Sequence, residues 1–269
     1  MSSTRKTPPP KRKPFSAKKE TPNQLTFTRG AYQVNGCKMY GVNTFLDNSV
    51  LEPLSESDLK TAKCCTHVAE SPVARVELEH TKENTKLSTY HRSLSGVKKG
   101  KYLHSQIEKL VEKHKQTRAL SASKKKGVCV HPVARSVFAA MQRMDLTIHK
   151  SEVGVFSPGR RLATEADLVC VHNKTRRFVV VELKTGYKNL RAYTAPKFRL
   201  RFNRKVIVSE QQRHLLQLLT TTILFNHLHP KKTVGDCVLL QAPTHTEALA
   251  YSIPDWILAY RSQIEKLIK

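Results

Sequence analysis

Apolar and polar positions alternate most clearly in the middle of the chain, where apolar runs are separated by short polar turns. The runs are 146–157 (LTIHKSEVGVFS), 166–171 (ADLVCV) and 178–185 (FVVVELKT). The last is rich in β-branched residues, which is typical of a buried strand. The turn at 172–175 predicts that the second and third runs form a hairpin. We therefore expect three consecutive strands.

Apolar residues recur at helical spacing on both sides of these strands. The segments are 100–115, 131–144, 209–228 and 254–269, and a further strand is expected at 235–243. Ser209 is a candidate N-cap for the third helix. The predicted order is helix, helix, three strands, helix, strand, helix. This order indicates an α/β core in which a small mixed sheet is flanked by helices.

The N-terminal third of the chain has a weaker pattern. Residues 1–23 are basic and rich in proline and serine, so we expect a disordered tail. Residues 24–98 are interpreted as a helical or mixed extension, with a strand or hairpin arm at 25–34 and a strand leading into a short helix at 40–51. A helix is also expected at 55–70. Residues 99–269 are assigned to the core domain.

Charge and cysteine usage narrow the class of protein. The chain has 47 Lys and Arg against 21 Asp and Glu, a formal net charge of +26, which favours a polyanionic partner such as nucleic acid. The cysteines lack CxxC spacing, and with no signal peptide this indicates reduced thiols in a cytosolic or nuclear setting. PPPKRKP resembles a nuclear localisation signal, and its three consecutive prolines argue against a helical mitochondrial presequence. No apolar run is long enough to span a membrane.

Acidic residues on the three central strands are candidates for metal chemistry. They are Glu152, Asp167 and Glu182, and Lys184 projects from the same strand face as Glu182. Carboxylates are the ligands that Mg²⁺ and Mn²⁺ favour, and a lysine can orient a water and offset charge on a phosphate. The alternative is an ordinary hairpin with a surface Glu–Lys pair. His104, on the predicted helix at 100–115, is either a metal ligand or a histidine at a helix edge.

The segment 187–205 is interpreted as a basic loop with interleaved aromatic residues. Its candidate phosphate contacts are Lys188, Arg191, Lys197, Arg199 and Arg201. Its aromatic residues are able to stack on unpaired bases. The alternative is a solvated loop whose aromatic residues pack on the core.

Several of these segments, in this order, resemble motifs of the PD-(D/E)xK nuclease superfamily, and most of all its RecB-like exonuclease branch. The segments are YGVNTFL, GKYLH, SEVGV, TEADLV, VVVELKTG and HLLQLLTTTILF, covering roughly residue 40 to the C-terminus. The resemblance implies a restriction-endonuclease-like fold and a Mg²⁺- or Mn²⁺-dependent deoxyribonuclease. It further implies an exonuclease acting in DNA repair, recombination or genome processing, with RNA left open as a substrate.

The resemblance also implies a role for each matching residue. Asp167, Glu182 and the carbonyl of Leu183 would bind the metal together with His104, and Glu152 would add a ligand or an outer contact. Lys184 would position the attacking water and stabilise charge on the phosphate, and Gln217 would orient the lysine or the substrate.

Two features depart from the family pattern. Thr221 occupies the position of a tyrosine that usually follows the motif glutamine, so Gln212 remains an alternative to Gln217. The four cysteines that hold an iron–sulfur cluster in some relatives have no counterpart, and we expect no cluster. A catalytically inactive relative and a structural basic nucleic-acid-binding protein remain alternatives to a nuclease.

Overall fold

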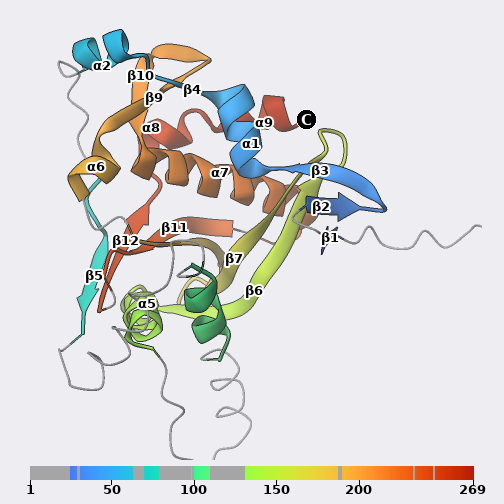
Figure 1. Cartoon of the computed structure of the whole chain (residues 1–269). Helices are drawn as coiled ribbons and strands as arrows, with labels where there is room; N and C mark the ends of the chain where they lie inside the picture. The colour runs from blue at the N-terminus through green and yellow to red at the C-terminus, as the bar shows by residue number, and fades with distance from the viewer. Residues whose placement is uncertain are drawn as a thin grey trace, which may run out of the picture.

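A central sheet with helices on both faces organises the protein (Figure 1). The computed structural model describes residues 25–28, 31–62, 70–78, 98, 100–109, 131–186, 190–232, 234–244 and 246–269. The expected disordered tail, residues 1–23, lies outside the described residues. The described part therefore has the expected α/β class, with a mixed sheet between helical layers.

The predicted three-strand unit forms the middle of the sheet. Strands β6 (Leu146–Ser157), β7 (Leu162–His172) and β8 (Phe178–Thr185) are joined by short turns, and β7 pairs antiparallel with both neighbours. Strand β11 (Val234–Ala242) pairs parallel with β8, and β12 (Glu247–Ser252) pairs antiparallel with β11. Strand β12 was not expected from the sequence.

The segment 24–98 supplies strands to both ends of this sheet. Strands β1 (Leu25–Thr28), β2 (Ala31–Val34) and β3 (Cys37–Gly41) form an antiparallel ribbon, which joins the sheet where β3 pairs parallel with β7. At the opposite end, β5 (Ala74–Glu77) pairs with β12. Residues 25–34, expected to be a strand or a hairpin arm, form a complete hairpin of β1 and β2. What was expected to be an extension is thus partly built into the sheet.

Helix α7 (Glu210–Leu228) covers one face of the sheet (Figure 1). Ser209 and Gln212 form a capping box at its start, which confirms Ser209 as the N-cap. Most of its side chains are buried because further elements cover its outer side. These include α1 (Val42–Phe45), the π-helical turn η1 (Leu46–Val50), α8 (Asp255–Leu258) and α9 (Arg261–Ile268). A helix enclosed in this way provides a rigid support for residues that it directs at the sheet.

The opposite face carries α5 (Pro132–Arg143) and a helix that includes residues 100–109. His131 caps α5 by accepting a hydrogen bond from the Val133 N–H at its Nδ1. Leu103 and Ile107 pack with Val179, Val181 and Leu183, which alternate along β8. Both helices were expected, and the second directs His104 towards the sheet.

Two expectations for the C-terminal half are wrong. The basic segment 187–205 is not a loop, because its described part contains α6 (Leu190–Thr194) and the hairpin β9 (Pro196–Leu200) and β10 (Asn203–Ser209), extended by β4 (Leu51–Pro53). Its many basic residues concealed the strand pattern, since their charges are neutralised by acids from elsewhere in the chain. The single closing helix is also divided into α8 and α9, with Pro254 at the N-cap of α8.

Three other observations complete the fold. Helix α2 (Glu56–Ala62) occupies the start of the expected helix at 55–70, and Ser55 and Asp58 bond to each other's backbone N–H there. In the described residues, none of the helices is long and apolar enough to cross a membrane. The cysteines in these residues, Cys37, Cys170 and Cys237, are unpaired.

Candidate metal and phosphate site

The candidate site lies where strands β7 and β8 diverge. They pair from Val171 and Phe178 up to Leu168 and Val181. Beyond this point β8 continues alongside β11, whereas the start of β7 pairs with β3 at Ala163. The opening is bridged by one side chain, because Asp167 Oδ2 accepts a hydrogen bond from the Leu183 N–H at 2.7 Å. An opening between strands allows side chains from both faces of a sheet to meet.

His104, Glu152 and Asp167 come together at this opening. His104 Nδ1 lies 2.6 Å from Glu152 Oε1, and His104 Nε2 lies 3.9 Å from Asp167 Oδ1. One potential ligand atom from each residue lies within 4.8 Å of the others. Carboxylate oxygens and an imidazole nitrogen are a donor set that fits a divalent cation such as Mn²⁺ or Mg²⁺. The three residues come from helix 100–109, β6 and β7, so the tertiary fold creates the group.

Glu152 has a strained backbone within β6. Its φ is 48°, in the left-handed region that a glutamate seldom adopts. The flanking pairs, Ser151 with Leu168 and Val153 with Ala166, place Glu152 opposite Asp167. Such strain costs on the order of 1–3 kcal/mol and is concentrated at functional sites in proteins. The sequence placed Glu152 among the acids of this site, and the structure shows the backbone distortion that accompanies its contact with His104.

Glu182, Lys184 and Gln217 form a second group beside the first. Lys184 Nζ lies 2.6 Å from Glu182 Oε1, and Gln217 Nε2 donates to the same oxygen at 2.7 Å. Glu182 is only 2% exposed, so its charge is held by these two contacts away from bulk solvent. Gln217 rather than Gln212 reaches the site, since Gln212 is engaged in the cap of α7.

One oxygen in the second group lacks a hydrogen bond within the described structure. Gln217 Oε1 is buried without a partner there. Buried polar atoms are almost always satisfied, and exceptions occur at sites that take a water, an ion or a ligand. The Gln217 amide therefore has an acceptor available close to Glu182.

The two groups are coupled electrostatically through Asp167. Burial and the neighbouring Glu182 charge raise the pKa of Asp167 to about 7, against the opposing effects of His104, Lys184 and the Leu183 N–H. Burial lowers the pKa of His104, but the Glu152 hydrogen bond and the charges of Asp167, Glu152 and Glu182 outweigh it and raise the pKa overall. This surplus of negative charge favours a bound cation.

The Asp167 shift predicts a contribution to the stability of the metal-free protein that is lost as pH rises. The folded-state pKa of about 7 exceeds the ordinary value of 3.8, so between these values the folded state binds more protons at Asp167 than the unfolded state. The contribution of Asp167 to the free energy of unfolding should therefore fall as pH rises from about 4 to about 7, by a few kcal/mol at most, since one pKa unit is worth about 1.4 kcal/mol. Asp167→Asn should flatten this slope in urea unfolding measured with chelator.

His104 contributes in the same direction. Its raised pKa stabilises the folded protein below its ordinary value of 6.5, and this contribution is lost as pH rises through the folded-state value. Burial lowers the pKa of His214 well below 6.5, which contributes in the opposite direction, so the test is the difference in slope between the wild type and Asp167→Asn. The matched control is Asp236→Asn, on an exposed residue near the other end of β11. Equal slopes for the wild type and Asp167→Asn would contradict the prediction.

Glu165 and Tyr32 lie near the site but are not part of the donor group. Glu165 lies two residues before Asp167 on β7, and burial and the Glu152 charge raise its pKa. Burial and the Glu165 charge raise the pKa of Tyr32 to about 12, although a hydrogen bond with the Thr164 side chain opposes this. Because side chains alternate along a strand, Glu165 and Asp167 project from the same face of β7. No local sequence pattern pointed to Tyr32, because it is the pairing of β3 with β7 that brings Tyr32 near the site.

The candidate phosphate contacts of segment 187–205 are mostly engaged within the protein. Lys197 pairs with Glu210 at 2.7 Å, Arg199 pairs with Asp58 at 2.7 Å, and Arg201 donates to the carbonyl of Leu51 at 2.7 Å. Arg191 is exposed, and Lys188 lies outside the described residues. The aromatic residues of the segment also pack inward: Tyr193 is buried and bonds to His214.

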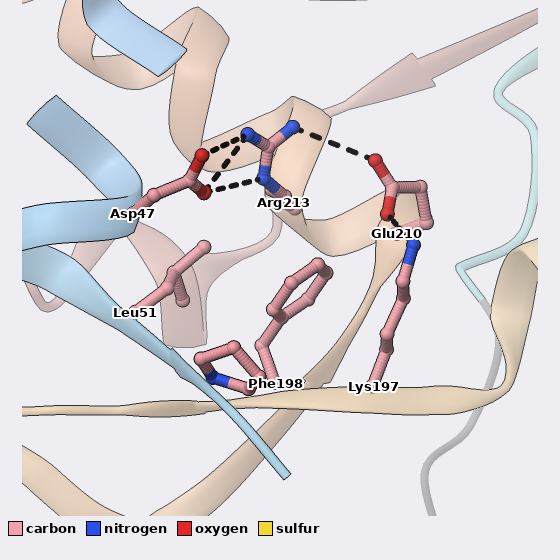
Figure 2. Close-up of a pocket in the computed structure, with 7 residues that line it drawn as sticks. Asp47, Leu51, Lys197, Phe198, Glu210 and Arg213 are labelled. Carbon is pink, nitrogen blue, oxygen red and sulfur yellow. Dashed lines mark hydrogen bonds and ion pairs between the residues drawn. The ribbon is translucent and has the colours of Figure 1, made fainter. Parts of the chain in front are cut away.

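A cavity of about 500 Å³ lies beside the β9–β10 hairpin, and none of the candidate catalytic or metal-binding residues lines it. Figure 2 shows Arg213 of α7 held between the carboxylates of Asp47 and Glu210, with Glu210 also paired to Lys197. Leu51, Pro53 and Phe198 form its apolar part. Its charged groups neutralise one another, so it offers no net attraction to a phosphate.

Comparison with known proteins does not assign the chain to a family. No protein-family model matches it, and a search of curated proteins finds no match. The geometry of the site therefore carries the functional argument.

Proposed function

We propose that this protein is a divalent-metal-dependent nuclease with a restriction-endonuclease-like core. The observation that carries the proposal is the meeting, at one opening between strands, of the His104–Glu152–Asp167 donor group and the Glu182–Lys184 pair. A surface Glu–Lys pair would need neither the buried glutamate nor the three convergent donors. The motif resemblance of the sequence agrees with this assignment.

His104, Glu152 and Asp167 would hold a Mg²⁺ or Mn²⁺ ion. The carbonyl of Leu183 and the carboxylate of Glu182 would be further oxygen donors from β8, as the resemblance implies. The bound ion would supply Lewis-acid stabilisation of charge that develops on a phosphate. Histidine as one of the donors favours Mn²⁺ somewhat over Mg²⁺, because imidazole is a softer ligand than carboxylate.

Lys184 would act on the water that attacks phosphorus. Its ammonium is held by Glu182 at 2.6 Å, on the strand that also carries the Leu183 contact to Asp167. From this position it would orient the water and offset the negative charge of the transition state. Gln217 fixes the partner of the lysine by donating to the same Glu182 oxygen, so it is a positioning residue. Hydrolysis following the resemblance would leave a 5′-phosphate.

The charge of the chain favours a nucleic acid as the substrate. The chain has 47 basic residues against 21 acidic ones, and this positive charge suits a polyanionic substrate. Lys98 and Lys101 are exposed on the helical segment that carries His104. We propose DNA, cut from an end, as the substrate, with RNA as the alternative to be tested. Repair, recombination and genome processing are all tasks for such an activity.

Digestion of labelled nucleic acids tests the proposal. The purified protein should degrade end-labelled linear DNA with Mg²⁺ or Mn²⁺ and should stop when a chelator is added. Covalently closed circles should survive if the enzyme acts from ends, and a labelled RNA of the same sequence tests the sugar preference.

Two results would contradict the proposal. Binding of DNA without cleavage at any divalent metal concentration would favour an inactive relative or a structural nucleic-acid-binding protein. Cleavage that is unaffected by the chelator would exclude the metal-dependent mechanism. Degradation of circles as fast as linear molecules would leave the nuclease in place but make it an endonuclease.

A further inference from the structure

We propose that Phe27 and Tyr32 form a stacking platform for unpaired bases of the strand whose phosphate lies at the metal site. This inference rests on the proposed nuclease function and names the feature of the substrate that the β1–β2 hairpin would recognise. The platform is an aromatic pair at the rim of the site, made by residues far from it in sequence.

The hairpin packs closely against β6 beside the acidic cluster. A Cβ at Gly154 of β6 would lie 2.7 Å from Leu25 Cδ2 and 3.4 Å from Leu25 Cβ, so a larger residue there would push the Leu25 side chain aside. Gly154 pairs with Glu165 across the β6–β7 ladder, two residues along from Glu152 and Asp167. The contact therefore places Leu25 of β1 beside β6, two residues along the strand from Glu152.

Tyr32 connects the hairpin to the site. Its side chain forms a hydrogen bond with Thr164 of β7, the residue next to Glu165. Its ring is partly buried beside Val34 and Met39. These contacts hold Tyr32 against β7, near the acidic residues of the site.

Phe27 extends this surface outward. Residues 27 and 32 are directly paired across the hairpin, and their ring centroids lie 5.0 Å apart with an interplanar angle of 54°. Phe27 is 58% exposed, so much of its ring is open to solvent. An exposed ring that is held in place loses little conformational entropy when a flat partner stacks on it.

A base fits this surface better than a phosphate does. Glu165 is near enough to both Tyr32 and Glu152 for its charge to act on them, and a negative charge here would repel the backbone of a nucleic acid. Neutral bases carry no such penalty, and every base has a π face for stacking. Bases in a duplex are stacked on each other, so the occupant must be unpaired. The site should consequently prefer single-stranded nucleic acid or frayed ends.

Fluorescence of 2-aminopurine in a single-stranded oligodeoxynucleotide tests this directly. Binding should be measured with Mg²⁺ in the full chain carrying Lys184→Met, so that cleavage does not interfere. Stacking should quench the fluorophore, and Phe27→Ala should weaken binding and quenching by about 5- to 150-fold, the range that corresponds to about 1–3 kcal/mol for one stacked base. Phe27→Leu should resemble Phe27→Ala, because it retains apolar volume but no ring.

Tyr40→Ala is the matched control. Tyr40 is also an exposed aromatic residue of the same ribbon, at 58%, but it is next to Met39, which is paired with Tyr32, and so points to the opposite face. The Tyr40→Ala variant should bind the oligodeoxynucleotide as tightly as the parent protein. Binding of a blunt duplex should be unchanged in all these variants.

The outcomes separate this inference from the proposed function. If the wild type cleaves DNA but Phe27→Ala retains full quenching, the platform is wrong and the nuclease stands. If Phe27→Ala loses quenching while the wild type never cleaves, the platform stands on a binding protein. An equal loss in Tyr40→Ala would mean that the effect is not specific to the platform, which would overturn it.

Discussion

Lys184→Met is expected to reduce the rate of DNA cleavage by about 100- to 1000-fold, the usual effect of removing one group that stabilises transition-state charge. Methionine retains the length and apolar stem of lysine but has no charge to place on the water or the phosphate. The buried Glu182 loses its ion-pair partner in the variant, but Gln217 still donates to it. We expect the chain to fold and to bind its metal.

Single-turnover cleavage with saturating enzyme measures this effect on the chemical step. Circular dichroism and Mn²⁺ titration should show that the fold and the metal site are retained. Lys174→Met is the matched control, because Lys174 is an exposed lysine in the turn between β7 and β8. It removes the same charge from the same hairpin at the end away from the site. Cleavage by Lys184→Met at the rate of Lys174→Met would remove Lys184 from the mechanism.

Asp167→Asn is expected to weaken metal binding by more than about 100-fold and to abolish cleavage at ordinary metal concentrations, since even outer partners of metal ligands contribute about 10- to 100-fold to affinity. Asp167 belongs to the donor group and lies opposite Glu152. The amide oxygen of asparagine can still accept the hydrogen bond from the Leu183 N–H, so the junction between β7 and β8 is preserved. The loss would therefore report on the missing charge.

Calorimetric titration of Mn²⁺ into the wild type and Asp167→Asn measures the change in affinity. Asp236→Asn is again the control, because it removes an acid from the far end of β11. Partial recovery of cleavage at high Mn²⁺ concentration is expected, since mass action compensates for weaker binding. Unchanged Mn²⁺ affinity in Asp167→Asn would show that the three residues do not hold a metal.

Much of the architecture could be predicted from local patterns. The β-branched run at 178–185 and the turn before it gave the β7–β8 hairpin, and Ser209 marked the start of α7. These features depend on backbone preferences and on burial of one face. Both can be recognised from residues that are close together in the sequence. The segments where prediction failed are those whose partners are distant. The charges of Arg199 and Lys197 suggested a solvated loop because the acids that pair with them, Asp58 and Glu210, belong to other elements.

The amino-acid sequence alone indicates which groups are candidates for chemistry at this site. Strand alternation put Glu182 and Lys184 on one face, and the ordered motifs identified His104, Asp167 and Gln217 as candidates. The first inference rests on strand geometry. The second rests on the resemblance of these segments to the motifs of the nuclease superfamily.

Only the tertiary structure decided how those groups combine. Divergence of β7 from β8 allows His104 from one helical layer and Gln217 from the other to approach the same opening. Long-range pairing of β3 with β7, and the fit of Leu25 against Gly154, bring Phe27 and Tyr32 to its rim. Contacts between residues so far apart in the sequence depend on how whole layers pack together. The spacing of residues within one segment does not predict that packing.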